Sequence, residues 1–559
     1  MQPYLLAPPQ GQEQADEWMR MGLEAQTKGN LPQAQVYYGH ALRLNPRHAL
    51  VTQNLAILFA QSNLINEALL TIERAAMMDG VFGIIQANWS LMALEAEHID
   101  VALRAAYKAL ELAENAETRM SVALLMAVAG TPEKAIDLYN KVLDDKPDHP
   151  TAGPNACFVQ TLTNATPKDL LKQRTRWYQT HRYKGEKKPH TNSKDLTRPL
   201  KVGYVGGDFK THSAAMIFSN VLLSHTKAVT PICYSTLPIN IDADPMTKLF
   251  HEATTLKDVN ALDDDKLEAM VRADQIDILV DLAGHTNGGR LTLFTRKPAP
   301  IQVTAWGFAH GTGCPEIDYF FADPIAVKAE EREHYAEQIV DLPSIVTYRP
   351  PAGILNGVSS LPYYRHDYIT FGSYARYEKL SDACLTTFAR ILKAVPDSRL
   401  ELKDHGFRRP YSIKRVMSFM DGIAPERLLF SIATTHQEHL LTYQQADLML
   451  DPFPHGGGVV SLEQLYMGVP MITRYGTQPA GRTGASVLTV LGKQDWIAKD
   501  EDEYVEKAVA MVQDLPKLAA MRKTLRQEFL DSPVVKGYAE QVEAAYRTMW
   551  ERWCQKSSS

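Results

Sequence analysis

Three consecutive glycines, Gly456 to Gly458, stand within the sequence DPFPHGGGVVSLEQLYMG, which runs from Asp451 to Gly468. They follow an apolar, strand-like run and precede a stretch with helical periodicity. Each glycine inside a regular element costs roughly 0.5 to 1 kcal/mol relative to alanine, so a triplet needs a reason. A sharp turn between strand and helix is one reason. Another is that the amides that open a helix can approach an anion such as a diphosphate.

Polar residues also follow apolar, strand-like runs elsewhere in the chain: His212 after GYVGGDFKT, Asp281 and His285 in DLAGHTNGGR, and Lys379 in YARYEKLSDA. Glu463 stands about one turn inside the helix that we expect after the glycines. A lone histidine at a strand end is more often a structural hydrogen-bonding group, but here the arrangement recurs at several loops. Backbone amides for a diphosphate, a lysine for its charge and a carboxylate for a ribose together predict a nucleotide-sugar site.

Length and charge limit the class of protein. A chain of 559 residues predicts three or four domains, since one domain usually spans roughly 100 to 200 residues. The net charge of -6 gives no overall attraction for DNA or RNA, so we expect no nucleic-acid partner. No apolar run approaches the length of a membrane span, and the N-terminal residues do not resemble a signal peptide. We therefore expect a cytoplasmic protein without a membrane partner.

The cysteines and the basic residues give weaker indications. The five cysteines are widely scattered and form no C-x-x-C pair, which predicts reduced thiols and not disulfides or zinc ligands. The one markedly basic stretch runs from Lys172 to Lys201, and we interpret it as the solvated surface of a linker.

A repeat occupies the first part of the chain. Alanines recur at Ala34, Ala68, Ala102 and Ala135, with spacings of 34, 34 and 33 residues, which is the tetratricopeptide period. Small residues at these places allow paired helices to approach closely. We therefore predict an α-solenoid over residues 1–148, whose concave face would bind an extended protein or peptide acceptor. A purely structural spacer is the alternative.

Beyond Pro199 the pattern changes to short β-rich runs that alternate with helical stretches, which predicts an α/β fold with parallel sheets. We expect linker helices over 149–198, a first doubly wound, Rossmann-like lobe over 199–347, a hinge over 348–365 and a second such lobe over 366–559 that includes a C-terminal helix. Open α/β folds bind ligands beyond the carboxyl ends of their strands. Since the candidate nucleotide contacts all lie beyond Pro199, we also expect a chain that begins near Thr197 to fold and bind the nucleotide.

At this point the sequence resembles the O-linked N-acetylglucosamine transferases, which are tetratricopeptide proteins with a two-lobed GT-B catalytic region, and their bacterial relatives. The similarity is densest in RPLKVGYVGGDFKTH, DILVDLAGHTNGGRLTLFTRKPAPIQVTAWGF, EIDYFFADP and the segment from Phe430 to Gly476. The resemblance implies transfer of a sugar from a UDP-sugar to serine or threonine hydroxyls, with inversion and without a metal. The Asp-x-Asp sequence at Asp242 to Asp244 is a weak metal motif, so we expect no metal and no cofactor.

The resemblance also implies roles for individual residues. His212 matches a first-lobe histidine proposed as a base or acceptor contact, and Lys379 matches the lysine that neutralises the departing diphosphate. His439 matches a histidine near the uracil. The implied donor-binding set is Arg376, Lys379, Thr434, His439, Gly456, Gly457, Gly458, Val459, Val460 and Glu463. The possible sugar-side or acceptor-side set is Asp281, His285, His310 and Gly311.

This sequence departs from the family pattern at several of these positions. Gly458, Val459 and Val460 stand where the family usually has His-Thr-Thr, and Glu463 stands where it has aspartate. Arg376 replaces a glutamine, and His436 replaces a lysine. Backbone amides can still hold a phosphate, and glutamate can still reach a ribose. We therefore expect UDP binding more firmly than we expect N-acetylglucosamine to be the donor sugar.

Three functions stay open on the sequence alone. The leading one is a metal-independent UDP-sugar protein glycosyltransferase that modifies hydroxyls. An asparagine-directed glucosyltransferase would share the two-lobed body and would also lack His-Thr-Thr. A scaffold that has lost turnover is the third, although retention of His212, Lys379 and Glu463 argues against it. The donor sugar, the acceptor, the oligomeric state and the identity of any general base are not determined by the sequence.

Overall fold

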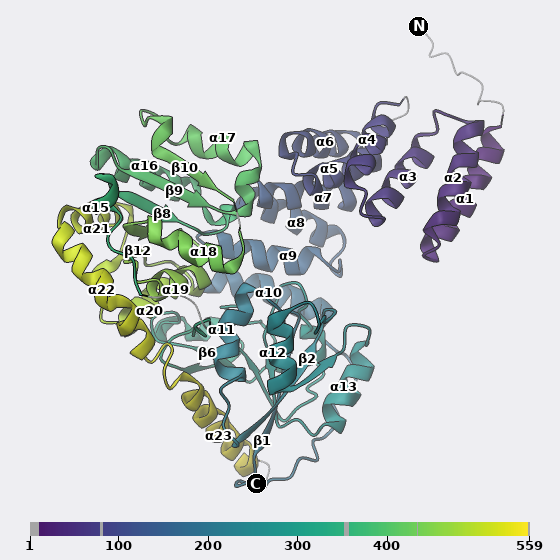
Figure 1. Ribbon diagram of the computed structural model, residues 1–559. Coiled ribbons are helices and arrows are strands. Elements are labelled where there is room, and N and C mark those ends of the chain that lie inside the picture. The colour runs from purple at the N-terminus through teal and green to yellow at the C-terminus, as the bar shows by residue number, and fades with distance from the viewer. Residues whose placement is uncertain (1–10, 79–81, 352–356, 433, 557–559) are drawn as a thin grey trace. The chain divides into compact units, whose positions relative to one another are not determined.

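The structure, a computed structural model, describes residues 11–78, 82–351, 357–432 and 434–556 (Figure 1). Contacts divide the chain into two compact units. The first comprises residues 1–146 together with 408–411, and the second comprises residues 147–407 together with 412–559.

The first unit consists of helices that pack in consecutive pairs, α1 with α2, α3 with α4, α5 with α6 and α7 with α8. Their bounds are α1 Gln12–Thr27, α2 Leu31–Leu44, α3 Ala49–Gln61, α4 Ile65–Ala76, α5 Gly83–Glu95, α6 Ile99–Leu112, α7 Ala116–Val128 and α8 Pro132–Asp145. The four repeat alanines lie in the second helix of each pair and are fully buried. At Gly22, a β-carbon would lie 2.5 Å from the Tyr38 ring, which shows why the repeat needs small residues. The predicted solenoid is confirmed.

The second unit contains two parallel sheets, each at the centre of a lobe. The first lobe has a seven-stranded sheet in the order β3-β2-β1-β4-β5-β6-β7. Its strands are β1 Leu200–Gly206, β2 Val229–Ser235, β3 Thr255–Asp258, β4 Ile278–Asp281, β5 Ile301–Thr304, β6 Tyr319–Ala322 and β7 Gln338–Asp341. Its helices include α11 Ser213–Leu222, α12 Pro245–Ala253, α13 Asp264–Ala273 and α14 Leu291–Phe294. The edge strand β3 has a short, partly exposed sequence, TLKD, which lacks the apolar run by which a buried strand can be predicted.

The second lobe has a six-stranded sheet in the order β10-β9-β8-β11-β12-β13. Its strands are β8 Thr370–Ser373, β9 Arg399–Lys403, β10 Leu428–Ser431, β11 Leu448–Leu450, β12 Met471–Arg474 and β13 Ile497–Ala498. Its helices include α15 Tyr363–His366, α16 Asp382–Ala394, α17 Pro410–Ser418, α18 His436–Thr442, α19 Val459–Tyr466, α20 Thr483–Val490, α21 Glu501–Gln513 and α22 Leu515–Asp531. The two-residue strand β13 was missed because it is too short to show a period.

The strand order of each sheet reverses at one place. In the first sheet the reversal falls between β1 and β4, and in the second it falls between β8 and β11. Loops that leave the carboxyl ends of strands at such a reversal separate to opposite faces and open a crevice. The segments that contain His212, Lys379 and the three glycines follow β1, β8 and β11. The topology therefore places the predicted site residues at the two crevices.

The segment before β1 is built into the second unit. It forms α9 Ala152–Val159, a short 3-10 helix at Gln160–Leu162, and α10 Pro167–His181. Cys157, Trp177 and Tyr178 are buried in one apolar cluster with Val205 of β1 and residues of β2, β4 and α13. The expectation that a chain from Thr197 onward folds and binds UDP therefore needs correction, because truncation there would strip one side of the first lobe.

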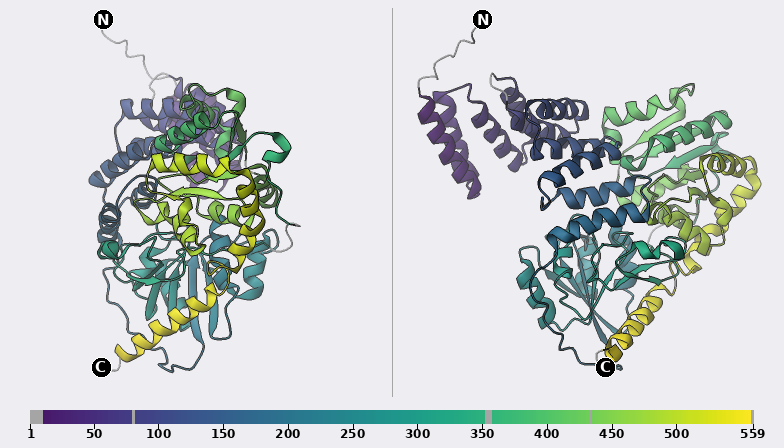
Figure 2. Two further views of the ribbon diagram at one scale, coloured as in Figure 1. Left: turned by 90° about the vertical axis from the view of Figure 1, so that its left-hand side faces the viewer. Right: turned by 180° about the vertical axis from the view of Figure 1, so that it is seen from behind.

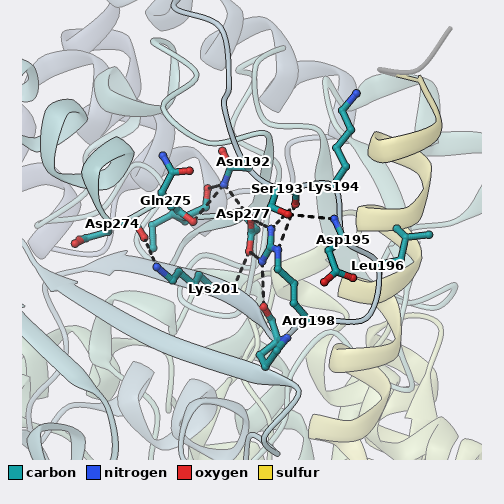
Figure 3. A network of polar contacts seen from close by, with 12 residues as sticks. Asn192, Ser193, Lys194, Asp195, Leu196, Arg198, Lys201, Asp274, Gln275 and Asp277 are labelled. Atoms are coloured by element: carbon teal, nitrogen blue, oxygen red, sulfur yellow. Dashed lines mark hydrogen bonds and ion pairs between the residues drawn. The ribbon is translucent and has the colours of Figure 1, made fainter.

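A network around the buried Asp277 carboxylate fixes the end of this segment, as Figure 3 shows. Arg198 donates to both oxygens at 2.6 and 2.7 Å, the Asn192 side chain donates at 2.9 Å, and the Lys201 amide donates at 2.9 Å. Arg174, within the same basic stretch, is also buried. The interpretation of residues 172–201 as a solvated linker surface is therefore wrong for these arginines.

The last helix, α23 Tyr538–Lys556, belongs by contact to the first lobe although it follows the second in sequence. It packs on α11 and β5, and Figure 2 shows it beside the first sheet. Arg547 donates to the carbonyls of Leu196 and Arg198. The buried Arg482 of the second lobe forms an ion pair with the partly exposed Glu331 of the first. These contacts join the two lobes into one body.

Residues 352–356 of the expected hinge lie outside the described part of the chain. None of the five cysteines is in a disulfide within the described part of the chain, and all five are buried. Among the described residues, no helix is long and apolar enough to cross a membrane.

Candidate active site

A cavity of about 900 Å³ lies in the second unit, and both lobes contribute to its wall. The second lobe contributes Arg376, Lys379, Lys403, Thr434, His436, His439, Glu463 and the run from His455 to Val460. The first lobe contributes Asp208, Lys210, His212, Trp306, Phe308 and His310, and the preceding helical segment contributes Phe158 and Thr161. This volume falls in the range of cofactor and ligand pockets and leaves room beyond a nucleotide.

Lys379 is a cation buried in the wall of this cavity. It ends a 3-10 helix, Tyr377–Lys379, and Ser381 caps the helix that follows. Its Nζ donates to the carbonyls of Gly456 at 2.7 Å and Gly457 at 3.1 Å. Burial lowers the pKa of Lys379 to about 7, and the nearby Arg376 guanidinium adds to this effect. An anion in the cavity would meet a fixed cation and would favour its charged form.

The glycine loop, defined here as Gly456 to Gly458, is folded by a buried carboxylate. Asp451 accepts hydrogen bonds from the Gly457 amide at 2.9 Å, the Ser461 hydroxyl at 2.8 Å and the Thr473 hydroxyl at 2.7 Å. The Gly456 amide donates to the Ala480 carbonyl. A β-carbon on Gly457 would lie 2.5 Å from the Ser461 hydroxyl oxygen. The tight turn therefore leaves no room for a side chain at Gly457, and the amides of both Gly456 and Gly457 already have partners.

A glycine stands at position 458 for a different reason. It precedes the first residue of α19, with φ 70° and ψ -116°, a conformation that side-chain-bearing residues avoid. The amides of Gly458, Val459 and Val460 open the helix, where no preceding helical carbonyl can accept from them. These three residues line the cavity, as does Lys379. The structure thus supports the turn as one explanation for the triplet, and the approach of a diphosphate to the helix N-terminus stays a prediction.

Glu463 lies on α19 with two histidines of α18 against it. His436 Nε2 lies 2.8 Å from one carboxylate oxygen, and His439 Nε2 lies 3.1 Å from the other. Burial alone would raise the pKa of Glu463, but hydrogen bonds from His436 and His439 outweigh it and lower the pKa to about 2. The hydrogen bond to Glu463 raises the pKa of His436 against the effect of burial. The role of Glu463 toward a ribose stays a prediction, and a ribose there would share the carboxylate with two imidazoles.

His212 caps the start of α11 and lines the first-lobe side of the cavity. Its Nδ1 accepts from the Ala214 amide at 3.3 Å and lies 3.3 Å from an Asp208 carboxylate oxygen. The imidazole is partly exposed, with 45% of the side chain accessible, so it can reach a group that enters the cavity. Thr434, on the opposite lobe, accepts a hydrogen bond from Lys403.

Three of the four residues grouped as sugar-side or acceptor-side contacts lie outside the cavity wall. Asp281 is buried and accepts from the Gly284 amide and the Thr304 hydroxyl, so it closes the turn after β4. His285 is buried with Nε2 2.8 Å from the Thr312 carbonyl, and burial lowers its pKa to about 3. Gly311 packs on Glu337, whose carboxylate oxygen would lie 2.7 Å from an added β-carbon. The assignment of these three to the sugar side therefore needs correction. His310 does line the cavity.

Other wall residues were not singled out from the sequence. Lys403 ends strand β9 and could have been found by the strand-end rule that indicated Lys379. His455 directly precedes the glycine loop. Phe158 and Thr161 come from the segment before the lobes, and the sequence carries no signal that they reach the cavity. Arg376 lies with its guanidinium carbon 5.6 Å from the centre of the Phe158 ring.

Two Rossmann-like lobes that enclose a cavity at their strand-order reversals, preceded in sequence by a tetratricopeptide solenoid, have the architecture of a GT-B fold. The chain belongs to glycosyl transferase family 41, whose family model matches residues 146–348 and 357–542. The resemblance inferred from the sequence is thereby confirmed.

Two curated plant proteins and one solved structure illustrate the similarity. "Probable UDP-N-acetylglucosamine--peptide N-acetylglucosaminyltransferase SPINDLY" from Petunia hybrida is 33% identical over 427 residues, which cover 73% of this chain and 45% of that protein. The correspondingly described protein SEC from Arabidopsis thaliana is 30% identical over 371 residues, which cover 64% of this chain and 37% of that protein. The chain thus spans less than half the length of these relatives. A mutant O-GlcNAc transferase from Thermobaculum terrenum superposes with a TM-score of 0.79 at 26% identity, covering 99% of this chain and all of that one.

Proposed function

We propose that this chain is an inverting glycosyltransferase that moves a sugar, N-acetylglucosamine, from a UDP-sugar to serine and threonine hydroxyls of protein. Membership of family 41 supports the reaction class. The names of the plant and bacterial relatives support the sugar and the kind of acceptor. The single observation that carries the proposal is the cation Lys379 held against the glycine loop, beside the amides that open α19, in one cavity.

The chemistry needs few side chains. When the glycosidic bond breaks, negative charge grows on the diphosphate, and fixed donors aimed at that charge stabilise the transition state. Lys379 and the amides of Gly458, Val459 and Val460 supply such donors. His212, on the opposite wall, stands where an acceptor hydroxyl would enter and can orient it or accept its proton. Holding donor and hydroxyl together supplies much of the remaining rate. No metal is required in this proposal.

The first unit supplies the acceptor surface in this proposal. Stacked helical pairs form an extended surface that suits peptide segments. We also propose a cytoplasmic location and no nucleic-acid or membrane partner. Fractionation of the producing cell, followed by detection of this chain, tests the location.

The test is transfer to a serine- and threonine-containing peptide library, read by mass spectrometry with fragmentation that locates the modified residue. UDP-N-acetylglucosamine, UDP-glucose and a GDP-sugar serve as alternative donors, so that the base and the sugar are tested separately. The proposal predicts an N-acetylhexosamine on serine or threonine with the first donor, unchanged by EDTA. A hexose on asparagine would favour the asparagine-directed alternative. UDP binding without transfer or donor hydrolysis would favour the scaffold.

A further inference from the structure

His455 directly precedes the glycine loop and lines the cavity. Its Nδ1 lies 3.1 Å from the Thr161 carbonyl oxygen and 3.2 Å from the Thr161 hydroxyl oxygen. The Thr161 hydroxyl donates its own hydrogen to the Phe158 carbonyl at 2.7 Å, so both Thr161 oxygens can only accept from the ring. Nδ1 therefore carries the proton and donates it to Thr161.

The accepting carbonyl is itself held in place. Gln478, whose side chain is fully buried, donates to the same Thr161 carbonyl at 3.2 Å and to the Thr163 carbonyl at 2.6 Å. Three separate segments thus meet at this point, the 3-10 helix before the lobes, the residue before the glycine loop, and the loop after β12. A hydrogen bond from one ring nitrogen to a fixed carbonyl sets both the tautomer and the orientation of an imidazole.

The surroundings of the ring favour its neutral form. Burial lowers the pKa of His455 well below its usual range, and the nearby positive charges of Lys379 and Arg376 add to the effect. A neutral imidazole that carries its proton on Nδ1 has a lone pair and no hydrogen on Nε2. Nε2 can therefore accept a hydrogen bond but cannot donate one. A ring that resists protonation this strongly is also a poor general base at neutral pH.

We propose that Nε2 of His455 accepts a hydrogen bond from a hydroxyl or amide N-H of the transferred sugar, and that this contact helps to determine which donor sugars are used. The inference rests on the proposed function, since it assumes that the diphosphate lies beside Lys379 and the glycine loop. The sugar is bonded to that diphosphate, and His455 is the residue that joins the loop. A sugar without a hydrogen-bond donor at the facing position would leave the buried acceptor unpaired, which is costly.

Two substitutions of His455 test the roles of its ring nitrogens, Nδ1 and Nε2, separately. His455→Asn places its amide nitrogen near the position of Nδ1, so it can keep the bond to Thr161 while it removes the Nε2 acceptor. His455→Gln places its amide oxygen near the position of Nε2, so it can keep the acceptor. Calorimetry measures the affinity of the wild type and both variants for UDP and for UDP-N-acetylglucosamine. Circular dichroism establishes that each variant is folded.

The inference predicts that His455→Asn binds UDP within about twofold of the wild type but loses at least about tenfold in affinity for the UDP-sugar, and that His455→Gln recovers part of this loss. Equal losses for UDP and the UDP-sugar, or no loss for either, would overturn the role of His455 in sugar recognition. Failure of the wild type to bind any nucleotide sugar would instead overturn the proposed function.

A measurement on the wild type alone keeps the inference testable if the variants do not fold. Donor analogues that each lack one hydroxyl or the amide N-H of the sugar are compared with the complete UDP-sugar. At least one analogue should lose about tenfold or more in affinity, because it leaves the Nε2 acceptor unpaired. Undiminished affinity for every analogue would contradict the inference.

Discussion

Replacing Lys379 by methionine tests the central residue of the site. Methionine keeps most of the length of the side chain and removes its charge. Lys379 is 8% exposed, and among the described residues its Nζ donates only to the carbonyls of Gly456 and Gly457. The change to methionine therefore leaves little empty space, and it leaves these two carbonyls without this donor. We expect Lys379→Met to fold.

The expected loss of activity follows from where the charge is needed. Loss of one fixed donor to a developing negative charge typically costs about 10² to 10³ in turnover, or about 2.7 to 4 kcal/mol. Because the charge grows in the transition state, the loss should fall mainly on kcat and less on donor affinity. Lys393→Met, which makes the same change at an exposed position of α16, is the control and should retain wild-type rates.

The pH dependence gives an independent readout. The pKa of Lys379 is about 7 in the folded protein and ordinarily 10.5. The fraction of cation therefore falls as pH rises through about 7, and kcat/KM of the wild type should fall with it. The free energy of unfolding should change with pH in the opposite direction to kcat/KM. Between pH 7 and 10.5 the unfolded chain binds more protons at this residue, so its contribution makes the free energy of unfolding rise with pH. Both effects should be absent from Lys379→Met.

The assay is the initial rate of transfer to the best library peptide, measured over a range of donor concentrations from pH 6 to 9. Thermal melts over the same range report stability. Near-normal kcat in Lys379→Met, or inhibition of the wild type by EDTA, would refute the assignment of Lys379 to the leaving diphosphate.

Three further predictions concern the loop, the carboxylate and the unit boundary. Gly458→Ala should lower the free energy of unfolding by about 1 to 3 kcal/mol because of the backbone conformation of Gly458, and it should weaken UDP binding. Denaturant titration measures the free energy of unfolding, and calorimetry measures UDP binding. Unchanged values of both would contradict the role of the loop. Glu463→Gln should destabilise the protein most between pH 4.5 and 6.5. The contribution of the Glu463 carboxylate to stability is lost as pH falls from 4.5 toward 2, and that of His436 is lost as pH rises above 6.5 through its raised pKa. A difference in melting temperature between the wild type and Glu463→Gln that does not depend on pH would contradict the pairing. A chain that starts at Pro147 should fold and bind UDP, whereas one that starts at Thr197 should show a weaker, broader thermal transition. Equal transitions for the two chains would contradict the packing of α9 and α10 on the first lobe.

The sequence predicted the elements whose periodicity is strong. The buried alanines of the solenoid recur at a fixed spacing, and the central strands are continuous apolar runs because helices cover both faces of a parallel sheet. The edge strand at Thr255–Asp258 and the two-residue strand at Ile497–Ala498 carry no such pattern. The place of α23 on the first lobe depends on contacts between distant parts of the chain, which local sequence does not encode.

The site was predictable where function follows from position after a strand. Lys379, His212 and Gly458 all follow strands at the reversals of strand order, and all line the cavity. The same rule also selected Asp281, which closes the turn after β4, and His285, whose ring contacts the Thr312 carbonyl in the segment after β5. Strand-end position alone does not distinguish a side chain that faces a ligand from one that closes a turn.

The part of the wall that comes from outside the two lobes could not be predicted. Thr161 reaches His455 across a sequence separation of 294 residues. Only tertiary packing brings these residues together, and it also decides which nitrogen of His455 carries the proton. The pairing of Glu463 with two histidines likewise depends on how α18 and α19 face one another.

The most direct test of the account is a crystal structure of the protein with UDP. We predict that the diphosphate lies within hydrogen-bonding distance of Lys379 Nζ and of the amides of Gly458, Val459 and Val460, with the ribose toward Glu463. Density for UDP elsewhere on the protein, or in this cavity with the diphosphate away from Lys379, would contradict it.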